Sequence, residues 1–344
     1  MIGIEMSPLD EAAGARAKER WDCIAKPLGS LGLLEDAIIK IAMIRRTENV
    51  RLEKRSVIVM CADNGVVCEG VSQSDSSVTA LCADEIAAGR SNVNVIARTV
   101  NADVTAVDIG TAGNTSALDR KISAGTKNIA FGAAMTRNEA ERAVMTGVEF
   151  VREAKANGTD IIVTGEMGIG NTTTAAATAS VLTGLPASAV TGRGAGLDDE
   201  RLAHKIEVIE RAVSINRPDK NDALDVLSKV GGFDIAGMAG LFIGGAECGI
   251  PVVIDGAVSA AAALTAERLV PGCRDYMLAS HVSAEPVGKL LLDALGLKPL
   301  ITAEMRLGEG TGGLMLLPLL DCALSVYNSA HRFDEINLER YRPL

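Results

Sequence analysis

Hydrophobic residues near the start of the chain follow a helical period. Between residues 8 and 50, Leu34, Ile38 and Ile41 recur at spacings of three and four positions, the spacing of one helix face. The segment KPLGSLG at 26–32 carries a proline and two glycines and interrupts this pattern. We therefore expect two N-terminal helices separated by a turn at 26–32.

Four short β-branched and apolar runs follow, at residues 56–61, 104–109, 160–164 and 251–254. Such continuous runs are typical of parallel strands that are covered on both faces. Each run ends in a glycine or an Asp-Gly turn, where an open α/β sheet places its ligands. The pattern predicts an α/β fold with a doubly wound parallel sheet.

The domain organisation follows from the absence of breaks in the pattern. No linker or low-complexity run divides residues 55–300, so we expect one large α/β domain there. The helical segments 1–54 and 301–344 are expected to pack together as a small second domain.

Composition excludes two classes of function. The chain has 344 residues, of which 48% are hydrophobic, so it is long enough to bury a large core. Its formal net charge is −10 and only 3% of its residues are aromatic. General nucleic-acid binding relies on positive charge, so no nucleic-acid partner is expected, and any anionic ligand must be bound locally. The apolar stretch 235–266 is interrupted by Glu247, Pro251 and Asp255, so no membrane span is expected either.

Cysteine and histidine usage argues against a metal site. The seven cysteines include no Cys-x-x-Cys pair, and the three histidines, His204, His281 and His331, lie far apart in the sequence. Residues 1–14 lack the basic and apolar regions of an export signal. We expect a soluble cytoplasmic protein with reduced thiols.

A glycine-rich loop, GEMGIGNTT at 165–173, follows the strand at 160–164 and precedes an alanine-rich helix at 175–181. A loop of this kind presents backbone N–H groups at a helix N-terminus, where an anion is stabilised. Neither a dinucleotide fingerprint nor a nucleoside triphosphate loop matches its spacing. The loop therefore predicts an anion held by backbone amides.

A second glycine-rich loop, RLGEGTGG at 306–313, places Glu309 between glycines just before an apolar run at 314–320. Glycine lets the backbone approach a ligand closely, so Glu309 is a candidate catalytic carboxylate in a substrate-binding loop. The alternative is a turn whose glutamate lies in the first turn of the following helix and interacts with the helix dipole. The loop alone leaves both interpretations open.

Several motifs together resemble the nicotinate-nucleotide:dimethylbenzimidazole phosphoribosyltransferase family. They are KPLGSLG at 26–32, the loops at 165–173 and 306–313, GRGAGLD at 192–198, GGFDIAG at 231–237 and HVSAEP at 281–286. The resemblance runs nearly end to end. It implies a Rossmann-like sheet with a small helical domain, usually in a homodimer. It also implies transfer of phosphoribose from nicotinate mononucleotide, a substrate and not a cofactor, to an aromatic base. The product is the α-ribotide used for the lower ligand of a cobamide.

The resemblance also implies roles for individual residues. Glu309, on a loop of the small domain, is expected to take the proton of the acceptor base. The residues expected to bind the substrates are Glu166, Met167, Gly168, Ile169, Gly170, Asn171, Lys205, Ser283, Ala284, Ser72, Leu81, Leu307, Gly308, Gly310, Thr311 and Gly312.

For four residues near these motifs, the residue type and its sequence context suggest a structural interpretation. Without the family pattern, Lys205 would be interpreted as a solvated helix lysine. We interpret His281 as structural, Asp255 as the cap of the helix that follows it, and His204 as a surface residue.

The sequence departs from the family pattern around the acceptor. Where relatives commonly read Asp-His-Gly-Val, this chain has Asn64 in place of the histidine, and an aromatic-proline pair is missing near Ser72. Leu81 stands where a glutamine is common, which removes a hydrogen bond to a second ring nitrogen. Three hypotheses follow. The chain uses dimethylbenzimidazole or a similar base, or it activates phenol or p-cresol with a paralogous partner subunit, or it is a non-catalytic nucleotide-binding subunit of such a pair.

Overall fold

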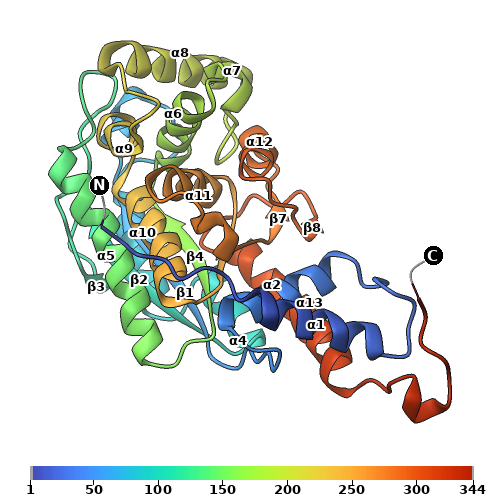
Figure 1. Ribbon diagram of the computed structural model, residues 1–344. Coiled ribbons are helices and arrows are strands. Elements are labelled where there is room, and N and C mark those ends of the chain that lie inside the picture. Colours follow the sequence, from blue (N-terminus) through green and yellow to red (C-terminus); the bar gives the residue numbers. More distant parts are fainter. Residues whose placement is uncertain (1–2, 343–344) are drawn as a thin grey trace.

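The computed structural model describes residues 3–342 and is built around a parallel sheet of six strands in the order β3-β2-β1-β4-β5-β6 (Figure 1). The strands are β1 (Arg55–Ala62), β2 (Ala102–Gly110), β3 (Leu118–Asp119), β4 (Ile161–Met167), β5 (Val252–Ile254) and β6 (Met277–Ala279). The chain order reverses between β1 and β4, which is the switch point of a doubly wound sheet. The predicted fold class is confirmed, and all four predicted strands belong to this sheet.

The helices are α1 (Glu11–Cys23), α2 (Leu33–Arg45), α3 (Ser77–Ala87), α4 (Asn92–Thr99), α5 (Arg137–Ala156), α6 (Asn171–Thr183), α7 (Ala187–Val190), α8 (Asp199–Asn216), α9 (Ala223–Val230), α10 (Phe233–Cys248), α11 (Ala257–Leu269), α12 (Pro286–Leu295) and α13 (Thr311–Ser329). Three 3₁₀ turns lie at Gly65–Glu69, Cys273–Tyr276 and Asp334–Ile336, and the short strands β7 (His281–Val282) and β8 (Ile301–Thr302) pair beside the main sheet.

The two faces of the sheet belong to two buried clusters because side chains alternate along each strand. In β1, Ile58 and Met60 join the cluster formed with α5, α6 and α8–α12. Val57 and Val59 join the cluster formed with α1–α4 and α13. Helices therefore cover the sheet on both faces, as its unbroken apolar strands require.

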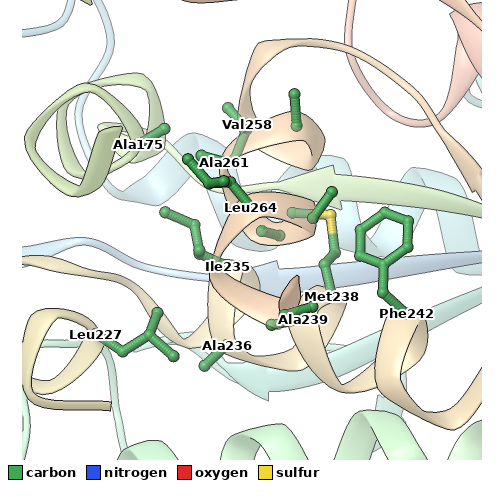
Figure 2. Close-up of a cluster of buried hydrophobic side chains, with 14 of the residues drawn as sticks. Ala175, Leu227, Ile235, Ala236, Met238, Ala239, Phe242, Val258, Ala261 and Leu264 are labelled. Carbon is green, nitrogen blue, oxygen red and sulfur yellow. The ribbon is translucent and has the colours of Figure 1, made fainter. Parts of the chain in front are cut away.

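Helix α10 lies at the centre of the first cluster and is buried over almost its whole length. A Cβ on Gly240 would lie 1.9 Å from the carbonyl oxygen of Val144 in α5, so only glycine permits this close approach of the two backbones. Figure 2 shows Met238 and Phe242 of this helix in the same apolar cluster as Leu264 of α11. Helices α5, α10 and α11 thereby pack together on one face of the sheet.

The terminal segments meet on the opposite face, where Figure 1 shows α1, α2 and α13 side by side. The rings of Trp21 and Tyr327, from α1 and α13, have centroids 4.9 Å apart. The same buried cluster continues onto β1, so the division into a large and a small domain stays a prediction. Among the described residues, no helix is long and apolar enough to cross a membrane.

Candidate functional site

A cavity of about 220 Å³ opens at the carboxyl ends of β4 and β5. Its wall is formed by Glu166, Met167, Gly168, Ile169, Asn171, Thr172, Gly194, Ala195, Asp255, Gly256, Ala257, Val258, Ser259, His281, Ser283, Glu285, Met305, Arg306, Leu307, Gly308, Glu309, Thr311 and Gly312. The cavity lies on the β4 side of the switch point, where doubly wound sheets bind their ligands.

Glu309 lies in a loop whose backbone is held in the left-handed region. The φ angles of Gly308, Glu309 and Gly310 are 85°, 61° and 91°. Glycine adopts this conformation freely, whereas a glutamate does so only when the surrounding structure imposes it. Such local strain often occurs at functional sites.

The carboxylate of Glu309 is nearly buried, with 8% of the residue exposed. Its Oε2 accepts a 3.0 Å hydrogen bond from the backbone N–H of Val93, in the first turn of α4. The helix that follows Glu309 begins only at Thr311. The interpretation of Glu309 as a first-turn residue of its own helix is therefore wrong, because its carboxylate caps a different helix.

Asp255 follows β5 and is buried beneath the Glu309 loop. Its two carboxylate oxygens accept hydrogen bonds from Gly310 N–H at 3.2 Å and Gly313 N–H at 2.9 Å. The prediction that Asp255 caps the helix after it is wrong: its carboxylate caps α13, which lies far along the sequence, and not α11. Burial raises the pKa of Asp255, while nearby His281 and these backbone donors act in the opposite direction.

His281 packs directly against the same loop. A Cβ at Gly312 would lie 2.1 Å from Cε1 of the imidazole, so residue 312 must be glycine for the ring to fit. Nδ1 of His281 lies 3.0 Å from the Ser280 hydroxyl. Burial lowers the pKa of His281, and the charge of Asp255 opposes that shift. The ring thus fills space under the loop, in agreement with its structural interpretation, and also forms part of the cavity wall.

Glu166 faces the cavity from the end of β4. Its Oε2 accepts a hydrogen bond from the side-chain amide of Asn171, at the start of α6. Burial raises the pKa of Glu166 to about 8, and the negative charge of Asp234 adds to this effect. Burial also raises the pKa of Asp234 to about 6. A pKa raised in this direction favours the protonated form of Glu166, which can donate a hydrogen bond.

Lys205 lies just behind the cavity wall. Only 1% of the residue is exposed, and its Nζ donates to Thr172 Oγ1 at 2.8 Å and to the Gly192 carbonyl at 3.3 Å. Burial lowers the pKa of Lys205 to about 8, while Glu285 favours the charged form. The interpretation as a solvated helix lysine is wrong. His204, in contrast, is exposed, as expected.

Most of the predicted site residues line this one cavity. The exceptions are Gly170, Gly310, Lys205, Ala284, Ser72 and Leu81. Gly170 and Gly310 are the residues that precede α6 and α13, so they shape the wall from behind. Ala284 is exposed next to the wall residue Ser283.

The residues predicted to contact the acceptor lie outside the cavity. Leu81 is 63% exposed on α3, and Ser72 lies in the loop before that helix. The structure gives these two side chains no contact with the cavity, so their role stays a prediction. Asn64 is fully buried and accepts a hydrogen bond from Thr174 Oγ1 at 3.2 Å. It therefore joins the end of β1 to α6, and its side chain does not line the cavity.

Several wall residues were missed by sequence reasoning. Asp255 and Gly256 form an Asp-Gly turn at the end of a predicted strand, which was the available signal. Gly194 and Glu285 lie within two of the motifs that carry the family resemblance, GRGAGLD and HVSAEP, and Glu285 Oε1 accepts the Gly194 N–H at 3.0 Å. In the part of the chain that the structure describes, no group of three His, Cys, Asp or Glu residues could hold a metal ion.

Comparison with known proteins finds similar chains over nearly the full length. The family model described as Phosphoribosyltransferase matches residues 6–338. A nicotinate-nucleotide–dimethylbenzimidazole phosphoribosyltransferase from Acetivibrio thermocellus is 47% identical over 329 residues, which cover 95% of this chain and 94% of that protein. The protein of the same name from Ruminiclostridium cellulolyticum is 45% identical over 332 residues, covering 96% and 94% of the two chains.

Solved structures agree with the sequence relatives. The crystal structure of CobT from Thermus thermophilus superimposes with a TM-score of 0.90 at 38% identity. The match covers 96% of this chain and 100% of that one. A second structure from the same organism, titled as the nicotinate-nucleotide–dimethylbenzimidazole phosphoribosyltransferase, has a TM-score of 0.90 at 37% identity and covers 97% and 100%.

Proposed function

Because the chain belongs to the nicotinate-nucleotide–dimethylbenzimidazole phosphoribosyltransferase family, we propose that its cavity moves phosphoribose from nicotinate mononucleotide to dimethylbenzimidazole or a similar base. The products are an α-ribotide, for assembly of the cobalamin nucleotide loop, and nicotinate. One observation carries the assignment of the site: Glu309 is a nearly buried carboxylate on a strained loop, and it forms part of the wall of the cavity.

The reaction needs mainly a base and correct positioning. Nicotinate is bound to C1′ of the ribose through its ring nitrogen, and its departure neutralises a pyridinium, so no strong acid is needed for the leaving group. The acceptor nitrogen attacks C1′ from the opposite face, forming the new C–N bond as the old one breaks, and the configuration inverts from β to α. The base removes the acceptor's proton and increases its nucleophilicity. Holding both substrates in one cavity supplies the rest of the rate enhancement.

Glu309 is the proposed catalytic base. The Val93 N–H engages Oε2, and no hydrogen bond within residues 3–342 engages Oε1. Oε1 is the oxygen that takes the proton of the acceptor. The loop holds this carboxylate in one position, so it needs little reorganisation when the acceptor arrives.

Glu166 is the proposed nucleotide-side carboxyl group. A second ionised glutamate would repel the phosphate and the carboxylate of nicotinate mononucleotide. The raised pKa of about 8 keeps Glu166 largely neutral, so it donates a hydrogen bond to the nucleotide. Asn171, which donates to Oε2, fixes the orientation of that carboxyl group.

The phosphate is proposed to bind where backbone donors and one cation meet. The N-terminal turn of α6 contributes Thr172 to the wall, and Ser283 faces it from beyond β7. Lys205 holds Thr172 through its Nζ and supplies positive charge from behind. Backbone N–H groups at a helix N-terminus together with a lysine are a common phosphate site.

The acceptor is proposed to be dimethylbenzimidazole, because the relatives at 47% and 45% identity carry that base in their names. The position of Leu81 on an exposed helix face gives no support for a phenol-specific pocket. The resemblance also leads us to propose a cytoplasmic homodimer, with no nucleic-acid or membrane partner.

Mass spectrometry of the reaction products tests the proposal. The purified chain is given nicotinate mononucleotide with an equimolar mixture of dimethylbenzimidazole, adenine, phenol and p-cresol. We expect an N-linked dimethylbenzimidazole ribotide and free nicotinate. An O-linked phenolic ribotide would replace the proposed acceptor, and no product from a folded, nucleotide-binding chain would support the non-catalytic subunit.

A further inference from the structure

We propose that Asp255 is a positioning residue that sets the place of the catalytic base by holding the backbone of the loop around Glu309. This inference rests on the proposed function, because it assigns Asp255 a role only through Glu309. It extends that function to a carboxylate whose sequence position, directly after a buried strand, suggested nothing more than a cap for the next helix.

Asp255 is well placed to act as a fixed point. It follows β5, which is paired on both sides, with β4 and with the edge strand β6. Its own backbone N–H donates to Ser259 Oγ at 3.1 Å, and Ser259 Oγ lies 2.7 Å from Thr164 Oγ1 of β4. Strand and helix therefore hold Asp255 from both sides of the turn.

The contacts of Asp255 converge on the loop. Oδ2 accepts the N–H of Gly310, the residue bonded directly to Glu309. Oδ1 accepts the N–H of Gly313, in the first turn of α13. One carboxylate thus joins the loop and the helix that follows, and it faces the positive end of a helix dipole. A neutral side chain or one of different length cannot satisfy both donors in the same way.

The loop needs such a contact because its conformation is unfavourable. Gly308, Glu309 and Gly310 all have positive φ, and Glu309 has a side chain that disfavours it. The backbone of the loop also packs against β4, since a Cβ on Gly165 would lie 2.5 Å from the carbonyl oxygen of Glu309. The other hydrogen bonds of the loop within residues 3–342 are local or lie on the side chain. Thr311 Oγ1 and N–H both bond to the Gly308 carbonyl, and Val93 bonds to the carboxylate itself. Asp255 connects the backbone of the loop to the sheet.

The packing around Gly312 also holds the backbone of the loop next to Asp255. The site of a Cβ at Gly312 lies 2.1 Å from His281 Cε1 and 2.9 Å from Asp255 Oδ1. The imidazole and the carboxylate therefore both pack against the same side of Gly312. Loss of the Asp255 charge removes the hydrogen bonds that draw Gly310 and Gly313 into this space.

Loss of the Asp255 contacts should affect catalysis more than nucleotide binding. If the loop relaxes, the Glu309 carboxylate moves relative to the acceptor, whereas Glu166 keeps its hydrogen bond from Asn171 and Lys205 keeps its bonds to Thr172 and Gly192. A displacement of about 1 Å at a reacting group costs roughly 100-fold in rate. We therefore expect Asp255→Asn to lower kcat by about 100-fold and to leave KM for nicotinate mononucleotide within about threefold of the wild type.

A double-mutant cycle with Glu309→Gln tests the inference. The four proteins are the wild type, Asp255→Asn, Glu309→Gln and the double variant, each checked for folding by circular dichroism. Because Asp255 acts through Glu309, its substitution in the Glu309→Gln background should change kcat by less than about threefold. Asp255→Glu keeps the buried charge but lengthens the side chain, and it is the variant to measure if Asp255→Asn fails to fold. Its kcat should also fall.

Asp108→Asn is the matched control. Asp108 is a buried carboxylate at the end of β2, bonded to Thr111, and it lies outside the cavity wall. Its substitution should lower stability and leave kcat within about threefold of the wild type.

The outcomes distinguish the role of Glu309 as the base from the role of Asp255 in positioning it. Full activity of Glu309→Gln overturns the assignment of the base and, with it, the positioning role. An inactive Glu309→Gln combined with normal kcat in the folded Asp255 variants overturns the positioning role alone. A rise in the nucleotide KM as large as the fall in kcat, or independent additive losses in the double variant, also overturns it, because Asp255 would then act on the nucleotide or on the fold.

Discussion

The backbone N–H of Val93 donates a 3.0 Å hydrogen bond to the carboxylate of Glu309, although the two residues are 216 positions apart in the sequence. Val93 lies in the first turn of α4, so the carboxylate faces the positive end of a helix. The bond fixes the position of one carboxylate oxygen of Glu309. The first turn of α4 is therefore part of the proposed catalytic arrangement.

Loosening the first turn of α4 should slow the reaction. Asn94 Oδ1 accepts hydrogen bonds from the Ser91 N–H at 3.1 Å and from the Ser91 hydroxyl at 2.7 Å, which completes a capping box. Asn94→Ala should cost about 1 kcal/mol of stability and lower kcat by roughly three- to tenfold. Steady-state kinetics and urea unfolding measure both effects. Thr99→Ala, at the far end of α4, is the control, and an equal fall in kcat there would refute the link to Val93.

Lys205 should govern nucleotide affinity in a pH-dependent manner. Its pKa of about 8 means that the lysine loses its charge as the pH rises through that value. The Kd for nicotinate mononucleotide should therefore rise above about pH 8, and Lys205→Met should raise Kd by about tenfold at pH 7. The variant should also show a weaker pH dependence than the wild type, because only the ionisation of Glu166, with its pKa of about 8, is left to oppose binding. Isothermal titration calorimetry measures the Kd. Lys289→Met, on the exposed face of α12, should behave as the wild type; a flat Kd profile in the wild type would argue against the role of Lys205.

Glu166 should make the fold less stable as the pH rises. A carboxyl group with a pKa of about 8 in the folded protein holds its proton where the unfolded chain, with the usual value of 4.5, has lost it. The unfolded state then binds fewer protons, so the free energy of unfolding falls as the pH rises from 4.5 towards 8. Asp234, with its pKa raised to about 6, adds to the fall at the acidic end of that range.

Urea unfolding at pH 5.5, 6.5 and 7.5 measures this dependence. Glu166→Gln should reduce the slope of the free energy of unfolding by up to about 1.4 kcal/mol per pH unit. Glu200→Gln, at an exposed position of α8, is the control and should keep the wild-type slope. Identical slopes in all three proteins would show that Glu166 does not hold a proton in this pH range.

Gly312 should tolerate no side chain. A Cβ there would lie 2.1 Å from the His281 ring, and both residues are buried. Gly312→Ala should cost about 1–3 kcal/mol of stability by overpacking and should also lower kcat, because the displaced ring and loop disturb Glu309. Gly132→Ala, where a Cβ meets nothing within 4 Å, should change neither the melting temperature nor kcat. If Gly312→Ala had the same melting temperature and kcat as Gly132→Ala, the close packing of His281 against Gly312 would be contradicted.

The sequence predicted the sheet well because its strands are buried on both faces and read as continuous apolar runs. The short strands β3 and β6 lack a distinct run, and β7 and β8 have two residues each, so pattern reasoning did not find them. The helices at the N-terminus were predicted from their apolar spacing and from the break at 26–32. These features are local, so the sequence reveals them directly.

The site was predicted through its motifs, and the errors concern contacts between distant segments. Asp255 and Gly313 are 58 positions apart, and neither neighbourhood indicates that the carboxylate caps α13 instead of α11. The burial of Lys205 depends on the loop containing Gly192 and on Thr172, which fold over an otherwise ordinary helix position. Long-range caps and burial of this kind follow from the tertiary fold and have no local signature.

The turnover rate of Glu309→Gln is the most direct test of the proposed chemistry. With saturating nicotinate mononucleotide and dimethylbenzimidazole, we expect kcat for nicotinate release to fall by about 100- to 10,000-fold, the usual contribution of a general base. The Kd for nicotinate mononucleotide should stay within about threefold of the wild type, because the substitution preserves the shape of the side chain. Turnover close to that of the wild type would contradict the assignment of Glu309 as the base.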